Sequence, residues 1–389
     1  MMEIYGFSFS LLELIVFGIL LVAFMYQIYF YFRYVNGVLR YRTKIKKNKV
    51  SFLTEQPPVS VIICAKDEAD NLRKFLPFVL QQDYPDFEVI VINDGSTDET
   101  ETLLRDLCKE HTNLRTTFVP VGANNVSTKK LGLTLGVKAA KNDILLFTDA
   151  DCMPEDKTWI ARMARNFGSE TDFVLGYGAY LQKKSFLNRL ITYDTLFIGL
   201  QYMGMALVRK PFMGVGRNLA YRKETFFAQK GFASTLHLNS GDDDLMVNKA
   251  ANGRNTCVEI APDSITWSEP NTNFKSWFYQ KERHLSVSSY YKESSKLRLS
   301  VEPTMRGIFY AALILVVVFG NLITVIAAAV LFVARLIVQL SIINSSAKHF
   351  GDRKHIFMLP VFDIYLPLVS LYILTFGRIT SKGKNVKWK

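Results

Sequence analysis

Hydrophobic and polar positions divide the 389-residue chain into two apolar regions that flank a long mixed body. The first apolar region, Phe7 to Phe32, contains a single charged residue, Glu13, and is long enough to cross a bilayer as a helix. A cleaved signal peptide is the alternative, but no basic segment precedes this run and no small-residue cleavage site follows it. We therefore predict a transmembrane helix within residues 1–33 and a basic juxtamembrane linker over residues 34–56.

Within residues 57–300, short apolar runs alternate with amphipathic segments. The apolar runs predict buried strands at Val59–Cys64, Phe87–Asn93 and near Leu114–Pro120, and a fourth that ends at Asp149. The segments between them predict helices over residues 67–82, 97–110 and 129–141. Strands that alternate with helices indicate an α/β domain with a mainly parallel sheet, whose ligands bind beyond the carboxyl ends of the strands.

The second apolar region covers residues 301–377 and is expected to form two or three membrane segments. Ile308–Asn344 has the length of two short spans or one long tilted helix, and Ile356–Phe376 is a further candidate although two prolines and an aspartate interrupt it. The number of spans decides on which side the basic tail, residues 378–389, lies, and we favour the cytoplasm. Phe197–Met213 predicts either a helix in the membrane interface or a buried core helix.

Charge is concentrated beside the apolar regions. Seven basic residues lie between Arg33 and Lys49 with no acid before Glu55, and five more lie in the tail, which together equal the formal net charge of +12. The positive-inside rule therefore places the body in the cytoplasm. The body itself is balanced, which argues against nucleic-acid binding and for contact with anionic membrane lipids. The four cysteines form no CxxC pair and have no zinc-type spacing, as expected for free thiols in a reducing compartment.

Two groups of carboxylates in the body are candidates for chemistry. Asp149 and Asp151 have the spacing that puts two strand side chains on one face, where they could hold Mg²⁺ or Mn²⁺ against a diphosphate. A solvated turn or helix cap is the simpler interpretation of Asp-x-Asp alone. Asp242, Asp243 and Asp244 repel one another, which is tolerated when metal, cations or a shared proton relieves the repulsion, or at a solvated helix start. One of them could act as a general base.

Other polar groups fall where a nucleotide site would need them. Ala65 and Glu68 follow the first strand, and Asp94 ends the second in an Asn-Asp-Gly-Ser turn, although a helix cap and a turn are the simpler interpretations of each alone. Lys129 begins a helix, where a cation opposes the dipole unless an anion lies close by. The remaining candidates are the glycine-hinged loop residues Gly216, Arg217 and Asn218, which suit an acceptor-side wall, and the helical pair Gln280 and Arg283, which otherwise reads as ordinary surface.

In this order, the motifs resemble those of the membrane-bound family-2 glycosyltransferases of GT-A fold. The resemblance extends from about Pro58 to His284. It rests on Ala65, Glu68, Asp94, Lys129 in a Lys-x-x-x-Leu-x-x-Gly pattern, the DxD of Asp149 and Asp151, Asp242 and Asp243, and Gln280 and Arg283 of a QxxRW motif. His284 stands where the family has Trp, which weakens any inference of a processive polymer synthase.

The resemblance implies an inverting single displacement from a nucleotide-sugar donor, expected to be UDP-linked, with a divalent metal. Asp149 and Asp151 would hold the metal and diphosphate, Lys129 and Arg283 would stabilise the leaving group, and Asp243 would be the catalytic base. The expected acceptor is a membrane lipid or lipid-linked glycan at the cytoplasmic face of a bacterial inner membrane. The alternatives are a processive polysaccharide synthase and a non-catalytic nucleotide-sugar-binding assembly subunit. No feature of the sequence fixes the oligomeric state.

Overall fold

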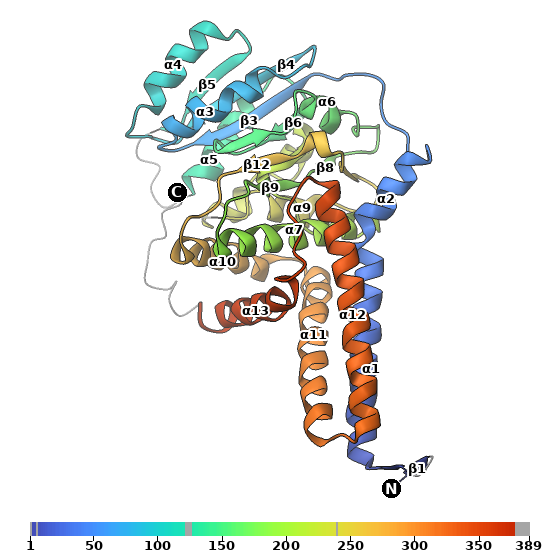
Figure 1. The fold of residues 1–389 in the computed structure, drawn as a ribbon. Coiled ribbons are helices and arrows are strands. Elements are labelled where there is room, and N and C mark those ends of the chain that lie inside the picture. Colours follow the sequence, from blue (N-terminus) through green and yellow to red (C-terminus); the bar gives the residue numbers. More distant parts are fainter. Residues whose placement is uncertain (1, 5–6, 121–126, 239, 378–389) are drawn as a thin grey trace.

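The computed structural model describes residues 2–4, 7–120, 127–238 and 240–377. Its centre is a seven-stranded sheet of order β11-β8-β10-β6-β3-β4-β5 (Figure 1). The strands are β3 (Val59–Ala65), β4 (Phe87–Asn93), β5 (Leu114–Phe118), β6 (Ile144–Phe147), β8 (Phe173–Leu175), β10 (Leu219–Arg222) and β11 (Thr256–Val258). Only β10 pairs antiparallel with its neighbours, β6 and β8. The predicted α/β class, the mainly parallel sheet and the first four strands are confirmed.

Helices cover both faces of this sheet because alternate strand residues point in opposite directions. Val61 and Ile63 pack with the side that carries α3 (Ala69–Leu80), whereas Ile62 packs with the side that carries α5 (Thr128–Ala139). The other predicted helix is α4 (Thr100–Glu110), and α6 (Trp159–Ala164) is added near the β10 end. Because β3 is parallel to both β4 and β6, the carboxyl ends of these three strands lie at one edge of the sheet.

A second layer separates the sheet from the membrane helices. It contains a three-stranded sheet of β7 (Cys152–Pro154), β12 (Thr266–Ser268) and β9 (Gly178–Tyr180), and the helices α7 (Phe186–Leu207), α8 (Lys223–Ala228), α9 (Asp244–Ala250) and α10 (Phe274–Val287). Most of α7 is buried in the main core. The apolar segment 197–213 thus begins as part of a core helix, the second of its two predicted interpretations.

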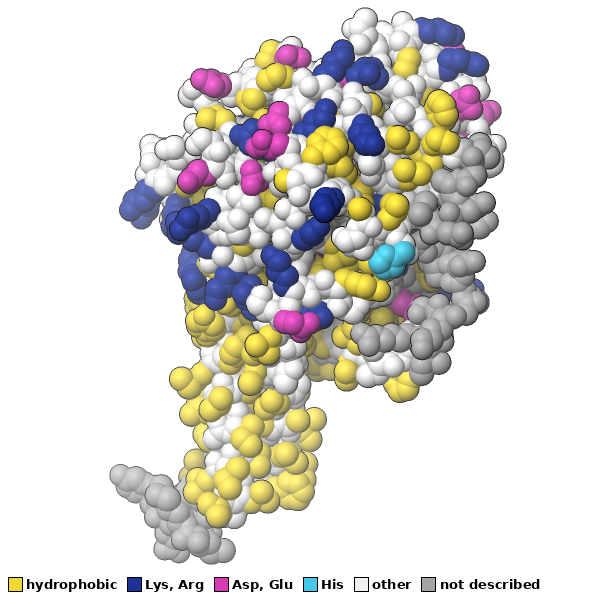
Figure 2. Space-filling view, turned by 180° about the vertical axis from the view of Figure 1, so that it is seen from behind, with side chains coloured by type: hydrophobic (Ala, Val, Ile, Leu, Met, Phe, Trp, Pro, Cys, Tyr) yellow, Lys and Arg dark blue, Asp and Glu magenta, His cyan; other side chains and the backbone are white. Residues whose placement is uncertain are grey.

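Four helices are long and apolar enough to cross a membrane: Leu11–Val35, Glu293–Phe319, Leu322–His349 and Leu359–Gly377. In Figure 1, α1 (Leu11–Phe30), α11 (Glu293–Phe319) and α12 (Leu322–His349) run side by side as a stalk, and α13 (Leu359–Tyr372) lies across its junction with the body. Figure 2 shows the stalk covered with hydrophobic side chains. A break at Gly320 and Asn321 makes residues 308–344 two helices, so the single long helix was wrong. The predicted tail, 378–389, lies outside the described residues.

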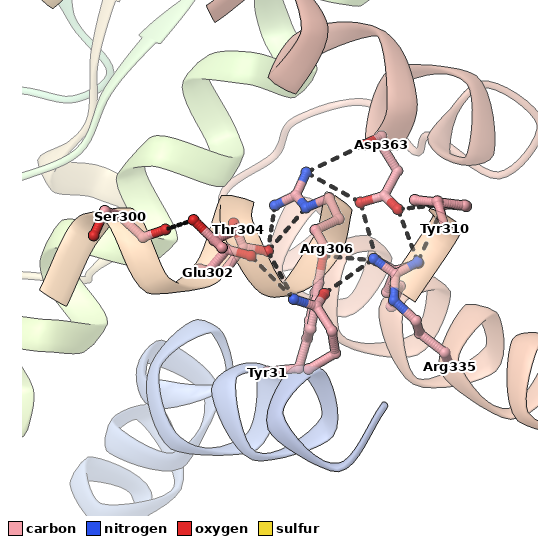
Figure 3. A network of polar contacts seen from close by, with 10 residues as sticks. Tyr31, Ser300, Glu302, Thr304, Arg306, Tyr310, Arg335 and Asp363 are labelled. Atoms are coloured by element: carbon pink, nitrogen blue, oxygen red, sulfur yellow. Dashed lines mark hydrogen bonds and ion pairs between the residues drawn. The ribbon is translucent and has the colours of Figure 1, made fainter. Parts of the chain in front are cut away.

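A buried polar network ties the stalk to α13 (Figure 3). The carboxylate of Asp363 on α13 lies 3.2 Å from Arg306 Nη1 on α11 and 2.8 Å from Arg335 Nη1 on α12. Arg306 also pairs with Glu302 at 2.6 Å, and Arg335 donates to Gln27 Oε1 on α1 at 3.0 Å. All five side chains are buried. Two cations and two anions therefore balance inside the junction, and all three stalk helices contribute to it.

The body and the stalk meet where two backbones approach without intervening side chains. A Cβ added to Gly204 of α7 would lie 1.9 Å from the carbonyl oxygen of Tyr34, in the π-helical turn (Tyr31–Val35) that follows α1. We expect Gly204→Ala to lower the free energy of unfolding by about 1–3 kcal/mol or more, because backbone cannot yield as a side chain does. Thermal unfolding in detergent measures this effect. Gly18→Ala, whose Cβ would meet nothing within 4 Å, is the matched control, and equal melting temperatures would contradict the prediction.

Candidate active site

Asp149 and Asp151 lie in the turn after β6, at the edge of the sheet where β3, β4 and β6 end. The prediction that they share one face of a strand was wrong, because β6 ends at Phe147, but the turn still brings them together. Their carboxylate oxygens and Cys152 Sγ lie within 4.8 Å of one another. Burial, with the charge of Asp149, raises the pKa of Asp151 to about 6. Two crowded carboxylates suit a hard divalent cation. Burial raises the pKa of the Cys152 thiol well above its usual value, so that group is the poorer ligand.

Lys129 connects this turn to the acidic triplet. Its Nζ lies 3.3 Å from Asp149 Oδ1 and 3.4 Å from Asp242 Oδ2. Burial favours the neutral amine, but Asp149 and Asp242 more than offset it and raise the pKa of Lys129. The next residue, Lys130, is fully buried and donates to the carbonyl oxygens of Thr235 and Ser240. Both lysines therefore hold the segment that carries the triplet against the first turn of α5.

The three carboxylates of the triplet have different surroundings. Asp243 precedes α9, and its Oδ2 accepts a 2.6 Å hydrogen bond from the backbone N–H of Gly216, while its Oδ1 accepts from Asp244 N–H. Burial and the charge of Asp242 raise the pKa of Asp243. Burial opposes ionisation of Asp242 as well, but Lys129 holds the pKa of Asp242 below its usual value. Asp244 accepts from Tyr291 Oη at 2.7 Å, inside the core. Asp243 is thus a fixed carboxylate with raised basicity.

The three residues of the loop 216–218 have different surroundings. The guanidinium of Arg217 stacks on the Tyr180 ring at 4.2 Å and donates to the carbonyl oxygen of Ala179. Asn218 is fully buried; its amide donates to Tyr177 and Ser264 carbonyl oxygens and accepts from Trp159. Gly216 and Arg217 line a cavity beside the DxD turn, whereas Asn218 is not part of its lining. The placement of Asn218 in an acceptor-side wall is therefore corrected: its amide joins β10 to neighbouring backbone.

Helix α10 lines the same cavity as Gly216 and Arg217. Gln280 donates to Tyr180 Oη at 3.1 Å and accepts from the Asn271 amide. Arg283 faces the same space, and its Nε is buried without a hydrogen-bond partner among the described residues. A buried, unpaired donor of a cation is costly unless an anion binds beside it. His284 also lines this space.

Hydrogen bonds join the turn after β3 to the turn after β4. Asp67 adopts a left-handed conformation with φ of 53°, and its Oδ1 accepts from the backbone N–H of Thr97. Ala65 is buried and its carbonyl oxygen accepts from Asp94 N–H; Asp94 in turn accepts from the hydroxyl of Thr128 at 2.6 Å. Glu68 is half-buried beside Asn71, which donates to it. Asp94 is thereby joined to the first turn of α5, next to Lys129.

One cavity of about 350 Å³ collects most of these groups. Its described lining includes Lys129, Asp149, Asp151, Gly216, Arg217, Asp242, Asp243, Gln280 and Arg283, but not Ala65, Glu68 or Asp94. The lining also includes the ion pair of Asp194 and Lys281, and Tyr291, which the sequence analysis missed. Asp194 and Lys281 are 87 residues apart; Asp194 belongs to no motif and Lys281 occupies a variable position of the QxxRW motif, so only helical periodicity on α7 and α10 could have suggested them.

Comparison with known proteins identifies the family that part of this chain matches. The family model described as glycosyl transferase family 2 matches residues 60–227, which include all of β3 except Val59, the elements from there to β10, and the DxD turn. The chain carries a family 2 glycosyltransferase domain. A solved structure, mannosyltransferase PcManGT from Pyrobaculum calidifontis in complex with GDP-Man and Mn2+, is similar with a TM-score of 0.57 and 19% identity, over 94% of this chain and 99% of that one. At that identity, the likeness establishes the GT-A fold alone.

Curated glycosyltransferases match shorter parts of the chain. Glycosyltransferase AglE of Haloferax volcanii is 32% identical over 123 residues, which is 31% of this chain and 39% of that protein. The poly-beta-1,6-N-acetyl-D-glucosamine synthase of Staphylococcus epidermidis is 32% identical over 98 residues, 25% of this chain and 23% of that protein. The chain therefore spans less than half the length of these two relatives, and each match covers less than a third of this chain.

Proposed function

We propose that this glycosyltransferase moves a sugar from a nucleotide-sugar donor to a lipid or lipid-linked glycan at the cytoplasmic membrane face, with inversion at the anomeric carbon. The observation that carries the proposal is the contact of Lys129 with both Asp149 and Asp242. This contact joins the DxD turn to the acidic triplet beside one cavity. A single bound donor could therefore place its diphosphate at the DxD turn and its anomeric carbon near the general base. The DxD match alone would not support this.

On the donor side, Asp149 and Asp151 would hold a divalent cation, Mg²⁺ or Mn²⁺, which neutralises charge on the departing diphosphate when bound. Lys129 and Arg283 would bind the diphosphate oxygens, Arg283 through the Nε that lacks a protein partner. Ala65, Glu68 and Asp94 would contact the nucleoside, with Gln280 lining the sugar end. Stabilisation of the leaving group by such fixed charges is expected to be the largest contribution to the rate.

On the acceptor side, Asp243 would remove the proton from the attacking hydroxyl. Its raised pKa favours proton acceptance, and the N–H groups of Gly216 and Asp244 fix its orientation. Asp242 remains ionised beside Lys129 and keeps Asp243 basic. Gly216 and Arg217 would form the wall behind the acceptor.

The apolar helices support a membrane-bound protein. The stalk exposes large hydrophobic side chains along its length, whereas exposed basic residues gather on α2 (Gly37–Lys46) where the stalk meets the body (Figure 2). Arg40, Lys44 and Lys46 would contact anionic lipid headgroups on the cytoplasmic side. In this arrangement α1, α11 and α12 cross the bilayer and α13 lies at its surface.

The testing experiment is donor turnover by detergent-solubilised protein, with Mn²⁺ or Mg²⁺, a panel of UDP- and GDP-sugars and a membrane-lipid extract. We expect one donor to release nucleoside diphosphate in a lipid-dependent manner, EDTA to abolish the reaction, and added metal to restore it. Mn²⁺ binding followed by electron paramagnetic resonance should be lost in Asp151→Asn. A ladder of products would favour the processive alternative suggested by the polysaccharide-synthase relative. Folded protein that turns over no donor would overturn the proposal, and binding of a donor without turnover would favour the non-catalytic subunit.

A further inference from the structure

Two helices face each other across the cavity, each with one stripe of side chains. The lining residues of α7 are Ile191, Asp194, Thr195, Ile198, Gln201 and Tyr202. They recur at intervals of three and four, which is one face of an α-helix, over about 16 Å. On α10 the lining residues Trp277, Gln280, Lys281 and His284 recur in the same way, and Arg283 and Leu285 flank them. The cavity is therefore a groove between one face of α7 and one face of α10.

The two ends of the groove have different chemistry. At one end lie Asp243 and the DxD turn. Leu299, which also lines the groove, belongs to the first turns of α11, and the later turns of that helix expose Ile314 and Leu315. The groove thus leads from the proposed general base to the root of a membrane helix, and its occupant must present a reacting group at one end and an apolar chain at the other.

An ion pair between α7 and α10 lies among the apolar side chains that line the groove. Lys281 Nζ lies 2.6 and 2.7 Å from the two carboxylate oxygens of Asp194, and the two side chains are only 10% and 14% exposed. The pair is neutral overall, but it presents both hydrogen-bond donors and acceptors to the cavity. Ile191 and Ile198 flank Asp194 on the α7 stripe. Such a pair among aliphatic side chains suits an uncharged ligand with several hydroxyl groups.

We propose that the groove binds the uncharged sugar head of a lipid-linked acceptor, and that Asp194 and Lys281 select this acceptor by hydrogen bonds to its hydroxyl groups. The inference rests on the proposed function and names the acceptor class for the same site. The lipid chain leaves along Leu285 and Leu299 toward α11. One sugar hydroxyl lies at Asp243, where its oxygen attacks the anomeric carbon, its proton passes to the carboxylate and the nucleoside diphosphate departs.

The charges around Asp243 favour a hydroxyl over a phosphate as the acceptor group. Asp242, Asp243 and Asp244 all line this end of the groove. Of the nearby cations, Lys129 is bound to Asp149 and Asp242, Arg217 lies on Tyr180, and Arg283 is assigned to the diphosphate of the donor. A phosphate brought to Asp243 would meet this excess of carboxylates, and it would need no base. A neutral hydroxyl avoids the repulsion and makes use of the base.

The test compares two reactions of the full-length protein: acceptor-free hydrolysis of the donor and transfer to a defined acceptor. The acceptors are octyl glycosides of several monosaccharides and a polyprenyl monophosphate, in a polyoxyethylene detergent because a glycoside detergent would itself compete. We expect Asp194→Asn and Lys281→Met each to raise the acceptor KM about tenfold and to leave the donor KM and hydrolysis within twofold. Lys109→Met, which removes an exposed ion pair on α4, is the matched control.

A third variant covers the case in which the ion-pair variants fail to fold. Ile198→Trp fills the groove and keeps the pair, so we expect transfer to fall at least tenfold while hydrolysis continues. An unchanged acceptor KM in all folded variants would overturn the inference, as would turnover of the polyprenyl monophosphate alone or hydrolysis with no transfer to any octyl glycoside. A wild-type protein that neither hydrolyses nor transfers any donor would instead overturn the proposed function, so the two failures are distinct.

Discussion

Replacing Asp243 with asparagine is expected to lower the rate of sugar transfer by about 10²- to 10⁴-fold, which is the usual contribution of a positioned general base. Asparagine has the size of aspartate, and its oxygen can still accept the hydrogen bond from Gly216 N–H. Its amide cannot take a proton from the acceptor hydroxyl. Steady-state transfer with saturating donor measures the change in kcat, and donor binding measured by calorimetry should stay within a few-fold of wild type.

Two controls separate loss of the base from loss of the fold. Asp106→Asn changes an exposed carboxylate on α4 that pairs only with Lys109 among the described residues, and it should be silent. The wild-type pH profile gives an independent signature: since burial and Asp242 raise the pKa of Asp243, kcat/KM should fall with decreasing pH from a higher pH than for an ordinary aspartate. Transfer by Asp243→Asn within a few-fold of wild type would assign the base elsewhere.

The site residues that come directly after a strand could be placed from the sequence. Parallel strands bring their carboxyl ends to one edge, so a motif directly after a strand has a known position. Asp94 after β4 and Asp149 after β6 were placed at this edge for that reason, and their contacts with Thr128 and Lys129 at the start of α5 agree with it. The acidic triplet was recognised because three adjacent carboxylates need an explanation.

The rest depended on side-chain directions that only packing decides. Asn218 was assigned to the cavity with its neighbours, yet the β10 backbone turns it into the core, where three protein partners satisfy its amide. Lys129 was predicted to lie beside an anionic ligand, and it contacts two carboxylates of the protein because the start of α5 places it between two loops. Asp194 and Lys281 meet through the packing of α7 and α10. Asp363 was read as an interruption of an apolar segment, because its partners lie on other helices.

Replacing Asp363 with leucine is expected to give the largest loss of stability, about 3–5 kcal/mol, because it leaves buried guanidinium groups without their counter-charge (Figure 3). Arg306 keeps Glu302 as a partner, whereas Arg335 would keep only neutral groups, among them Gln27 and Tyr310. An isolated cation at this depth is costly in a protein interior and in lipid. Thermal unfolding in detergent should show a marked fall in melting temperature, and limited proteolysis should release α13.

A second substitution shows whether charge or packing causes this loss. Asp363→Leu with Arg335→Met removes one anion and one cation, so Arg306 and Glu302 remain as a balanced pair. Replacement of buried ions by apolar side chains of similar size is often neutral or stabilising, and we therefore expect the double variant to recover most of the melting temperature lost by the single one. A double variant that loses as much as or more than the single would mean that Asp363 acts through the hydrogen bonds that join α13 to the stalk. Recovery would mean instead that α13 is held by its apolar contacts with α7 and α10, and that the ions serve to fix its register across the junction.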